Sequence, residues 1–381
     1  MDERTLTASY YSEFGSPCSC INKTFRIFVL LIIKTYTMRL FITLPLLFVI
    51  STSVWGQVRG QTFNAIDHHA KNTPASATRT IEKLAAYLNQ NTQTDLEKVR
   101  SYYTWITNHI AYDTKSFFSG KSTPETNAEN TLKNRKAICQ GYSELFKALC
   151  DYSNIPCYIV SGYSKGYGYR EGKKFIEADH AWNVVFVDQQ WQLLDATWGA
   201  GHVDDMQKFI HETTYDFFLT PPEIFILKHL PSDPMWQLLP CPISLADFAK
   251  NDAAITAKIN ESKPCFNFND TLAAFQQLNK VEQMTNSADR AYRFNPTNVE
   301  APGFAYLNMA FEMGSELKKH YDNKDYKKAL ELNQHLLLIN QKAYGYLKQS
   351  KSAQGKNAAT ICKQNISSLK NNIKSLEQFL K

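Results

Sequence analysis

Three residues of this chain have the types and the order of a thiol catalytic site. Cys139 stands at the start of an apolar helical pattern, and His180 and Asp195 bracket a pattern typical of one β-hairpin. A nucleophilic cysteine, a histidine base and an acid that orients the histidine form such a site when a fold brings them together. Each residue alone has a simpler explanation, as a buried thiol, a strand-edge residue or a turn cap. The prediction of a catalytic Cys139, His180 and Asp195 therefore depends on their order and on the elements around them.

Cys139 has to ionise before it can attack a carbonyl group. An ordinary cysteine, with a pKa of about 8.5, is only slightly ionised at neutral pH. The start of a helix favours an anion through its free N–H groups and its dipole, and the same N–H groups can receive an oxyanion. We expect His180 to share the thiol proton and Asp195 to fix the tautomer of His180 by accepting a hydrogen bond from it.

The spacing of the hairpin does not by itself bring His180 to Asp195. A two-residue turn at 189–190 places Asp195 opposite Val184, on the face of His180 but four residues further along the strand, or roughly 13 Å away. A bulge, a strong twist or another register has to close this distance. The register of the hairpin therefore stays open.

The composition is that of a globular protein that can bury more than one core. The chain has 381 residues, of which 44% are hydrophobic, and a mild net charge of +6. Residues 301–381 carry 13 Lys against 6 acidic residues. Such a segment could bind a protein partner or an acidic surface, although a solvated helix face is the simpler explanation. We expect no nucleic-acid partner.

Two apolar runs, at 25–33 and 40–50, precede the globular part of the chain. Each is shorter than the roughly 18–20 residues of a membrane span. If translation starts at Met38, residues 38–56 have the order of a signal peptide, and residues 1–37 are an over-long start or an N-terminal extension. We therefore expect a chain exported to the periplasm or the cell exterior, with no stable span after cleavage. Retention of the apolar runs as an anchor is the alternative.

The rest of the chain divides into three parts by pattern. Residues 57–78 are polar and aperiodic, which predicts a linker. Residues 79–243 mix helical and strand patterns and predict the core, in which Thr94 and Glu97 form the capping box of one helix. Residues 244–381 are helical and polar, and one stripe resembles a tetratricopeptide-type helix. No second copy recurs at a fixed period, so a helical domain is predicted rather than a repeat array.

The cysteines and histidines show no metal or disulfide framework. Six cysteines remain after the leader, and their spacing matches no disulfide scaffold or zinc motif. His68 and His69 form an isolated pair that we expect to be exposed. We therefore predict no metal and no cofactor. The Gly- and Tyr-rich stretch 162–172 lies between nucleophile and base, and it predicts a loop at the rim of the cleft.

A set of short motifs runs through residues of about 80–240. They are Trp105-Ile106, Ile110-Ala111-Tyr112-Asp113, Cys139-Gln140-Gly141-Tyr142, Val160-Ser161-Gly162-Tyr163, His180-Ala181-Trp182-Asn183, Leu194-Asp195-Ala196-Thr197-Trp198-Gly199 and His229-Leu230-Pro231. Together they resemble the transglutaminase-like superfamily, and specifically its kyphoscoliosis-peptidase-like branch.

This resemblance implies an α+β fold, with a papain/transglutaminase-like cysteine-protease core in which the helix bearing the cysteine packs on an antiparallel sheet. The family triad carries over to Cys139, His180 and Asp195, and none of the three is substituted. Trp182 and Trp198 are candidate substrate-binding walls of the cleft, with buried core aromatics as the simpler alternative. No calcium-site pattern of the animal transglutaminases is present.

The resemblance also implies a reaction. A thiol of this kind attacks peptide or amide bonds through a thioester, and it is a peptidase if water accepts the acyl group or a protein-crosslinking transglutaminase if an amine does. A non-enzymatic module that binds a peptide or a cell-wall polymer is the alternative from another class. We expect an exported cysteine peptidase that acts on a protein or peptide substrate.

Overall fold

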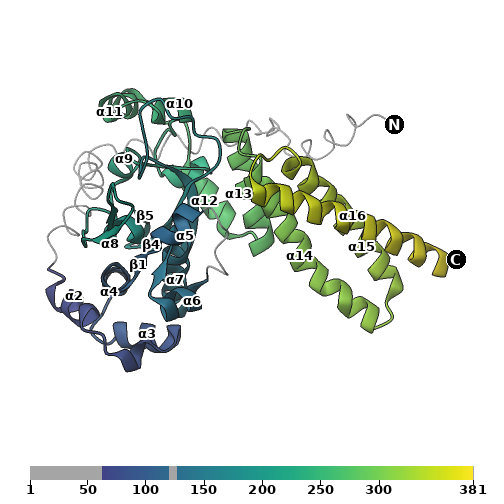
Figure 1. Cartoon of the computed structure of the whole chain (residues 1–381), viewed down its shortest axis with the longest axis horizontal. Coiled ribbons are helices and arrows are strands. Elements are labelled where there is room, and N and C mark those ends of the chain that lie inside the picture. The colour runs from purple at the N-terminus through teal and green to yellow at the C-terminus, as the bar shows by residue number, and fades with distance from the viewer. Residues whose placement is uncertain (1–61, 120–126, 381) are drawn as a thin grey trace, which may run out of the picture. The chain divides into compact units, whose positions relative to one another are not determined.

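The computed structural model describes residues 62–119 and 127–380 (Figure 1). The predicted extension at 1–37 and signal peptide at 38–56 lie outside these residues. Residues from Phe63 onward form one compact unit. Within the described ranges, none of the helices combines the length and the apolar character needed to cross a membrane.

The elements keep the labels of Figure 1. The helices before residue 240 are α2 (Asn64–Lys71), η2 (Ala75–Thr78), α3 (Ile81–Leu88), α4 (Asp95–His109), α5 (Thr114–Ser119), α6 (Ala128–Asn134), α7 (Cys139–Tyr152), α8 (Ala196–Ala200), α9 (Pro222–Phe225) and η3 (Pro234–Gln237). The strands are β1 (Ala111–Tyr112), β2 (Lys136–Ala137), β3 (Cys157–Ser164), β4 (His180–Val187), β5 (Gln190–Leu194), β6 (Gly201–Val203), β7 (Phe209–His211) and β8 (His229–Pro231). The later helices are α10 (Leu245–Phe248), α11 (Asp252–Glu261), α12 (Phe268–Gln276), α13 (Lys280–Phe294), α14 (Glu300–Asp322), α15 (Tyr326–Leu347) and α16 (Ala353–Phe379).

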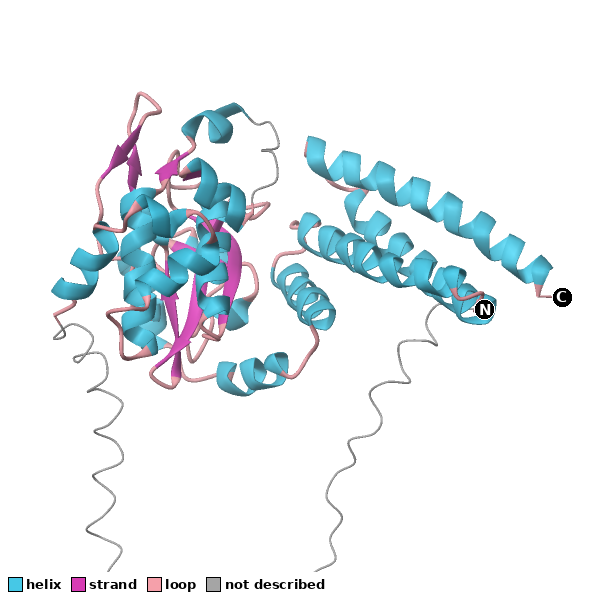
Figure 2. Ribbon diagram, turned by 90° about the horizontal axis from the view of Figure 1, so that it is seen from below, coloured by secondary structure: helices cyan, strands magenta, loops and turns pink. Residues whose placement is uncertain are grey.

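The centre of the fold is a four-stranded antiparallel sheet in the order β5-β4-β3-β8. Helix α7 packs against β3 and β4, and Asn183 on β4 donates from Nδ2 to the carbonyl of Ser143 on α7 at 3.1 Å. Figure 2 shows the strands with helices around them. The predicted α+β fold, with the cysteine-bearing helix on an antiparallel sheet, is confirmed.

Helix α4 supports the start of α7. It begins at the predicted capping box, where the Glu97 amide donates to Thr94 Oγ1 at 3.2 Å and the Thr94 amide donates to Glu97 Oε2 at 3.1 Å. At its other end the chain enters β1, which pairs in parallel with β2 and sets Tyr112 beside Ala137. Since Ala137 lies two residues before Cys139, this pairing fixes the approach of the chain to the nucleophile.

The linker predicted at 57–78 is wrong where the structure describes it. Helix α2 packs on α4, and its Ile66 and Ala70 are buried. Asp67 accepts two hydrogen bonds from Arg100 at 2.7 and 2.8 Å and a third from Thr104 at 2.8 Å. The helix has eight residues and buries only two, so its apolar pattern was too short to recognise.

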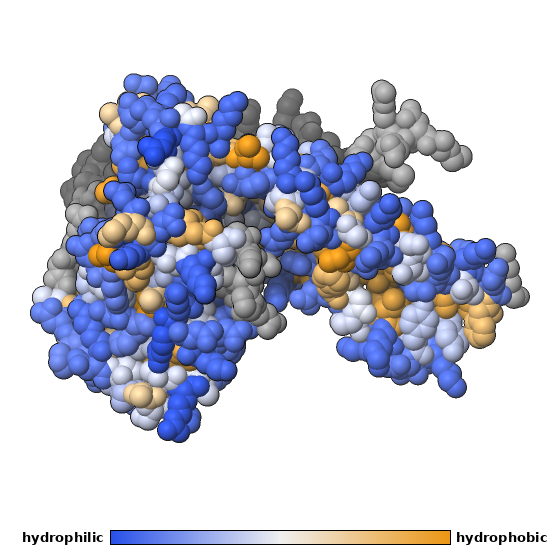
Figure 3. Space-filling model, viewed as in Figure 1, coloured by the Kyte–Doolittle hydropathy of each residue, from blue (hydrophilic) through white to orange (hydrophobic). Residues whose placement is uncertain are grey.

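The C-terminal residues are helical from α10 onward. The α15 helix packs against α14 and α16, and their shared core includes Leu336, Leu347 and Cys362. In contrast, Leu272 and Phe275 of α12 belong to the same hydrophobic cluster as Trp182 on the sheet. The early part of the segment assigned to a helical domain therefore packs on the core. Figure 3 shows a mostly hydrophilic face with apolar side chains on it.

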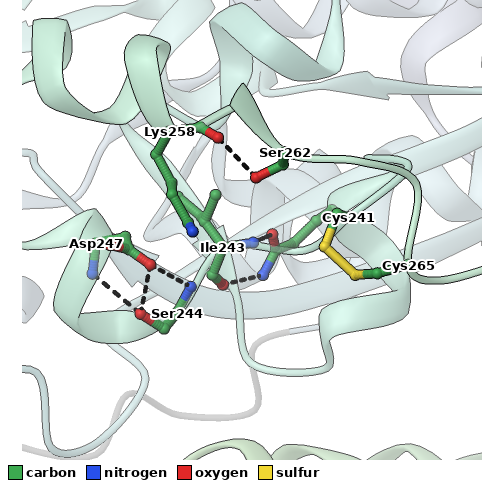
Figure 4. Close-up of a disulfide and its surroundings, with 8 residues drawn as sticks. Cys241, Ile243, Ser244, Asp247, Lys258, Ser262 and Cys265 are labelled. Atoms are coloured by element: carbon green, nitrogen blue, oxygen red, sulfur yellow. Dashed lines mark hydrogen bonds between the residues drawn. A yellow bond between two sulfur atoms is a disulfide. The ribbon is translucent and has the colours of Figure 1, made fainter. Parts of the chain in front are cut away.

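A disulfide joins Cys241 to Cys265, across 24 residues (Figure 4). It ties the segment after η3 to the segment before α12. Nearby, the side chain of Gln237 makes two hydrogen bonds to the backbone of Ile243, at 2.8 and 3.0 Å. The spacing of the cysteines gave no sign of this pair, because the two residues meet only through the packing of α10 and α11 between them.

Candidate active site

Cys139 is the first residue of α7 and is partly exposed. The amides of Gly141 and Tyr142 donate to the carbonyl of Ile138 at 2.9 and 3.3 Å. The amides of Cys139 and Gln140 come before these and have no acceptor within the helix, as in any first turn. An anion at the Cys139 sulfur therefore lies at the positive end of the helix dipole.

His180 and Asp195 are in direct contact. His180 is the first residue of β4, and its Nε2 lies 2.7 Å from Asp195 Oδ2. Asp195 follows β5 as the N-cap of α8, and its Oδ1 accepts from the amides of Thr197 at 2.7 Å and Trp198 at 3.1 Å. Both side chains are buried, with Asp195 fully enclosed. The structure thus brings the predicted base and acid together.

The register that the sequence left open follows from a turn one residue earlier than the two-residue turn considered at 189–190. The turn residues are Asp188 and Gln189, with φ of 50° and 63°, as a tight two-residue hairpin turn requires. Val184 consequently pairs with Leu193, and extending the ladder would set Asp195 opposite the residue two positions before Val184. The separation between His180 and the residue opposite Asp195 therefore falls from four residues to two. Asp195 leaves the strand as the N-cap of α8, and its carboxylate contacts His180.

The site holds a charged imidazole–carboxylate pair at neutral pH. Burial acts to lower the pKa of His180, but the charge of Asp195 and the hydrogen bond that His180 donates to it, together with the Cys139 sulfur as a second acceptor, raise it to about 10. Burial likewise acts to raise the pKa of Asp195, but the charge of His180 and hydrogen bonds from two histidines hold it well below its usual range. Since Nε2 of His180 contacts Asp195, Nδ1 is the ring atom left for the thiol.

The second of these histidines is His229, which the sequence did not mark as a site residue. It lies on β8, is fully buried, and places its Nε2 3.0 Å from Asp195 Oδ2. Its ring stacks on Phe225, with ring centres 4.1 Å apart. Its place in the motif His229-Leu230-Pro231 was the available sequence signal, and nothing in the spacing linked it to Asp195.

The two candidate substrate-binding tryptophans separate in the structure. Trp198 lines the cavity beside His180, with ring centres 5.5 Å apart. Trp182 is only 1% exposed and packs in the core cluster with Val160 and Val184. The alternative of a buried core aromatic therefore holds for Trp182, because later helices cover the face of β4 that carries it.

The cavity next to His180 has a volume of about 820 Å³. Aromatic side chains form much of its wall: Tyr112, Phe117, Tyr167, Trp198, Phe209 and Phe217. The predicted rim loop contributes residues 164–167. It begins later than predicted, because Gly162 pairs within β3 and Tyr163 is fully buried.

The side-chain nitrogen and oxygen atoms of His180, Asp195 and His229 lie within 4.8 Å of one another, which is close enough for a metal site to be considered. Two nitrogen–oxygen separations are only 2.7 and 3.0 Å. Ligands around tetrahedral zinc, at about 2.0–2.1 Å from the metal, would be roughly 3.3 Å apart. The distances therefore fit two N–H donors on one carboxylate oxygen. The absence of a metal or cofactor stays a prediction.

A carboxyl group in the chain between β3 and β4 predicts a pH-dependent effect on stability. Burial and the charge of Glu300 raise the pKa of Glu177 from 4.5 to about 7, against a hydrogen bond from the Glu300 backbone. Ionisation of Glu177 therefore disfavours the folded state, and stability falls as the pH rises through 7. We expect Glu177→Gln to increase the free energy of unfolding by about 1 kcal/mol at pH 8, allowing for solvent screening, and by little at pH 5.

Urea unfolding at the two pH values measures this difference. Glu171→Gln, in an exposed position of the same loop, serves as the control and should give equal effects at both. An equal effect of Glu177→Gln at pH 5 and pH 8 would contradict the burial of an ionised Glu177.

Comparisons with known proteins support the sequence resemblance. Residues 82–196 match the family model of the transglutaminase-like superfamily. Human kyphoscoliosis peptidase is 39% identical over 193 residues, which are 50% of this chain and 29% of that protein. The Lim and transglutaminase domain protein ltd-1 of Caenorhabditis elegans is 33% identical over 210 residues, which cover 49% of this chain and 27% of its own.

The matched region is less than a third of the length of either relative. A solved structure of a TGase aligns over 45% of this chain and 41% of its own, with 16% identity and a TM-score of 0.25. The family matches confirm the predicted branch for the core of the chain.

Proposed function

We propose that this chain, whose residues 82–196 form a domain of the transglutaminase-like superfamily, is a cysteine enzyme that attacks peptide or amide bonds through Cys139. The observation that carries this proposal is the charged pair of His180 and Asp195, 2.7 Å apart, together with the position of Cys139 as the first residue of α7. The sulfur of Cys139 is among the groups that raise the pKa of His180. The aromatic-walled cavity beside His180 supplies room for an extended substrate.

The geometry supports a two-step reaction. The Cys139 thiolate adds to the substrate carbonyl, and the N–H groups of the first turn of α7 receive the oxyanion. The carbon–nitrogen bond then breaks, and His180 gives its proton to the leaving amine, which leaves a thioester on Cys139. Water, deprotonated by His180, hydrolyses the thioester and restores the thiolate. Asp195 keeps the imidazole oriented in both steps.

Water as the acceptor makes the chain a peptidase, and the name of the human relative, a kyphoscoliosis peptidase, supports this choice. We also propose that the chain is exported. The support is the signal-like segment at 38–56 and the disulfide between Cys241 and Cys265, since disulfides persist mainly in oxidising compartments.

The reaction of Cys139 with iodoacetamide between pH 5 and 9 tests the thiol chemistry without a known substrate. We expect rapid alkylation at pH 6, because His180 takes the thiol proton, and a rate at least about tenfold lower at pH 6 in His180→Ala. Peptide mass mapping distinguishes Cys139 from the buried thiols Cys150, Cys157 and Cys362. A slow reaction that rises only near pH 8.5, whether or not His180 is present, would contradict the proposal and favour a binding module.

The acyl acceptor needs a second experiment. The chain is incubated with a mixture of glutamine-containing peptides and a labelled primary amine. New peptide N-termini, absent in Cys139→Ala, would support the peptidase. Incorporation of the amine without new N-termini would contradict it and identify a transglutaminase.

A further inference from the structure

The carboxylate of Asp195 has four hydrogen-bond donors within the described residues, and only one of them is His180. Oδ1 accepts from the amides of Thr197 at 2.7 Å and Trp198 at 3.1 Å. Oδ2 accepts from His180 at 2.7 Å and is 3.0 Å from Nε2 of His229. A carboxylate has about four lone-pair positions, so all of them are used. The side chain can neither rotate nor take a proton without losing a bond inside the protein.

His229 donates to Asp195 as a neutral imidazole. Burial lowers the pKa of His229, and the charge of His180 lowers it further, against the opposing influence of Asp195. Because Nε2 faces a carboxylate oxygen, Nε2 has to carry the single ring proton. By distance and angle, Nδ1 makes no hydrogen bond within the described part of the chain, although the backbone carbonyl of Phe225 is near enough to act to raise the pKa of His229.

The surroundings of His229 are built for this one contact. Besides Phe225, the rings of Trp198 and Trp182 lie 4.3 and 5.2 Å from its ring, centre to centre. An aromatic shell excludes water, and in such an environment a hydrogen bond to a charged group is stronger than at a surface. If the side chain served packing alone, burying two ring nitrogens in apolar surroundings would reduce the stability of the fold. An apolar side chain would pack here without this desolvation penalty.

We propose that His229 is a positioning residue of the active site: it holds Asp195 Oδ2 in place and weakens the attraction of this carboxylate for His180. The inference depends on the proposed function. The positive end of the His229 N–H dipole lies at the oxygen that also attracts the His180 imidazolium. It therefore makes His180 a stronger acid, which is better able to protonate the leaving amine.

Few other groups titrate near this pair. Tyr103, Tyr112 and Tyr142 all lie near the Asp195 charge, and burial raises the pKa of each, so they stay neutral between pH 5 and 9. Cys139 is the remaining partner of His180. A change in the pH profile of the thiol reaction over this range therefore reports on the imidazole and its carboxylate.

Alkylation of Cys139 against pH in the full chain tests the inference with two variants. His229→Phe keeps an aromatic ring in the shell but removes the donor, and His229→Gln keeps an N–H donor of similar reach. We expect His229→Phe to move the midpoint of the profile to higher pH by about half a unit or more. His180 is already charged over this range, so the Asp195 charge, no longer offset by the His229 donor, disfavours the thiolate. His229→Gln should keep the midpoint of the unmodified chain.

Two results would overturn the inference. An unchanged midpoint in His229→Phe, with only a lower melting temperature, would show that His229 serves packing alone. A midpoint moved to lower pH would show that His229 does not offset the charge of Asp195.

A second readout separates this inference from the proposed function. ¹⁵N spectra of the histidine rings should show a neutral His229 with its proton on Nε2 and a charged His180, assigned with His229→Gln. If the unmodified chain lacks low-pH reactivity, the proposed function fails, and these spectra alone decide whether His229 donates to Asp195. A His229 proton on Nδ1 would overturn the inference even in an active enzyme.

Discussion

Asp195→Asn is expected to lower the alkylation rate of Cys139 at pH 6 by about two orders of magnitude. The negative charge of Asp195 is what raises the pKa of His180 to about 10 against the opposing effect of burial. Without it the buried imidazole is neutral at pH 6, and the thiol loses its ion-pair partner. An ordinary thiol with a pKa of about 8.5 is only about 0.3% ionised at this pH. Rates at pH 6 from intact mass measure the loss.

The matched control is Asp179→Asn, one residue before His180. Asp179 lines the same cavity, but it accepts from the Ser164 amide at 2.8 Å and from Lys173 at 3.1 Å rather than from a histidine. Its substitution should leave the rate within about threefold. Equal losses in the two variants would mean that a general negative potential, and not the Asp195 contact, activates the thiol.

The same substitution should reduce stability in a pH-dependent manner. The raised pKa of His180 gives stabilisation that is complete below about pH 6.5 and is lost as the pH rises through 10. The lowered pKa of Asp195 gives stabilisation that is complete above about pH 4 and is lost at lower pH. Breaking a buried pair from one side costs about 3–5 kcal/mol. Urea unfolding should therefore show the largest loss near pH 5.5 and a smaller one at pH 10.

Local sequence signals predicted the elements that carry the site. The start of α7 at Cys139, the capping box of Thr94 and Glu97, and the hairpin that follows His180 all depend on residues close in the chain. For each of these the hydrophobic period and the capping chemistry agree with the fold.

The relations between elements could not be predicted in the same way. The hairpin register depends on left-handed backbone at Asp188 and Gln189, and glutamine is not a residue that favours this conformation. The contact of His229 with Asp195 spans 34 residues and depends on β8 joining the sheet edge beside β3. Tertiary pairing of this kind leaves no period in the sequence, which is why the second histidine was missed.

Gly162→Ala is expected to reduce the free energy of unfolding by about 3 kcal/mol and also to slow the thiol reaction at pH 6. A Cβ atom at Gly162 would lie 2.3 Å from the carbonyl oxygen of Leu230 and 2.4 Å from the Trp182 ring. Gly162 pairs with His180 on one side and with β8 on the other, so the clash cannot be relieved by one side chain alone. Moving β8 shifts His229, which is adjacent to Leu230.

Gly314→Ala in α14 provides a matched control of opposite sign. A Cβ there meets nothing within 4 Å, so helix propensity should increase stability by about 0.5–1 kcal/mol without any change at Cys139. Urea unfolding and alkylation at pH 6 are measured on both variants. If Gly162→Ala lost stability but kept the full thiol rate, the position of β8 would be independent of the catalytic pair. A loss of both stability and thiol rate in Gly162→Ala would instead show that the close packing of β3, β8 and Trp182 also sets the geometry around Asp195.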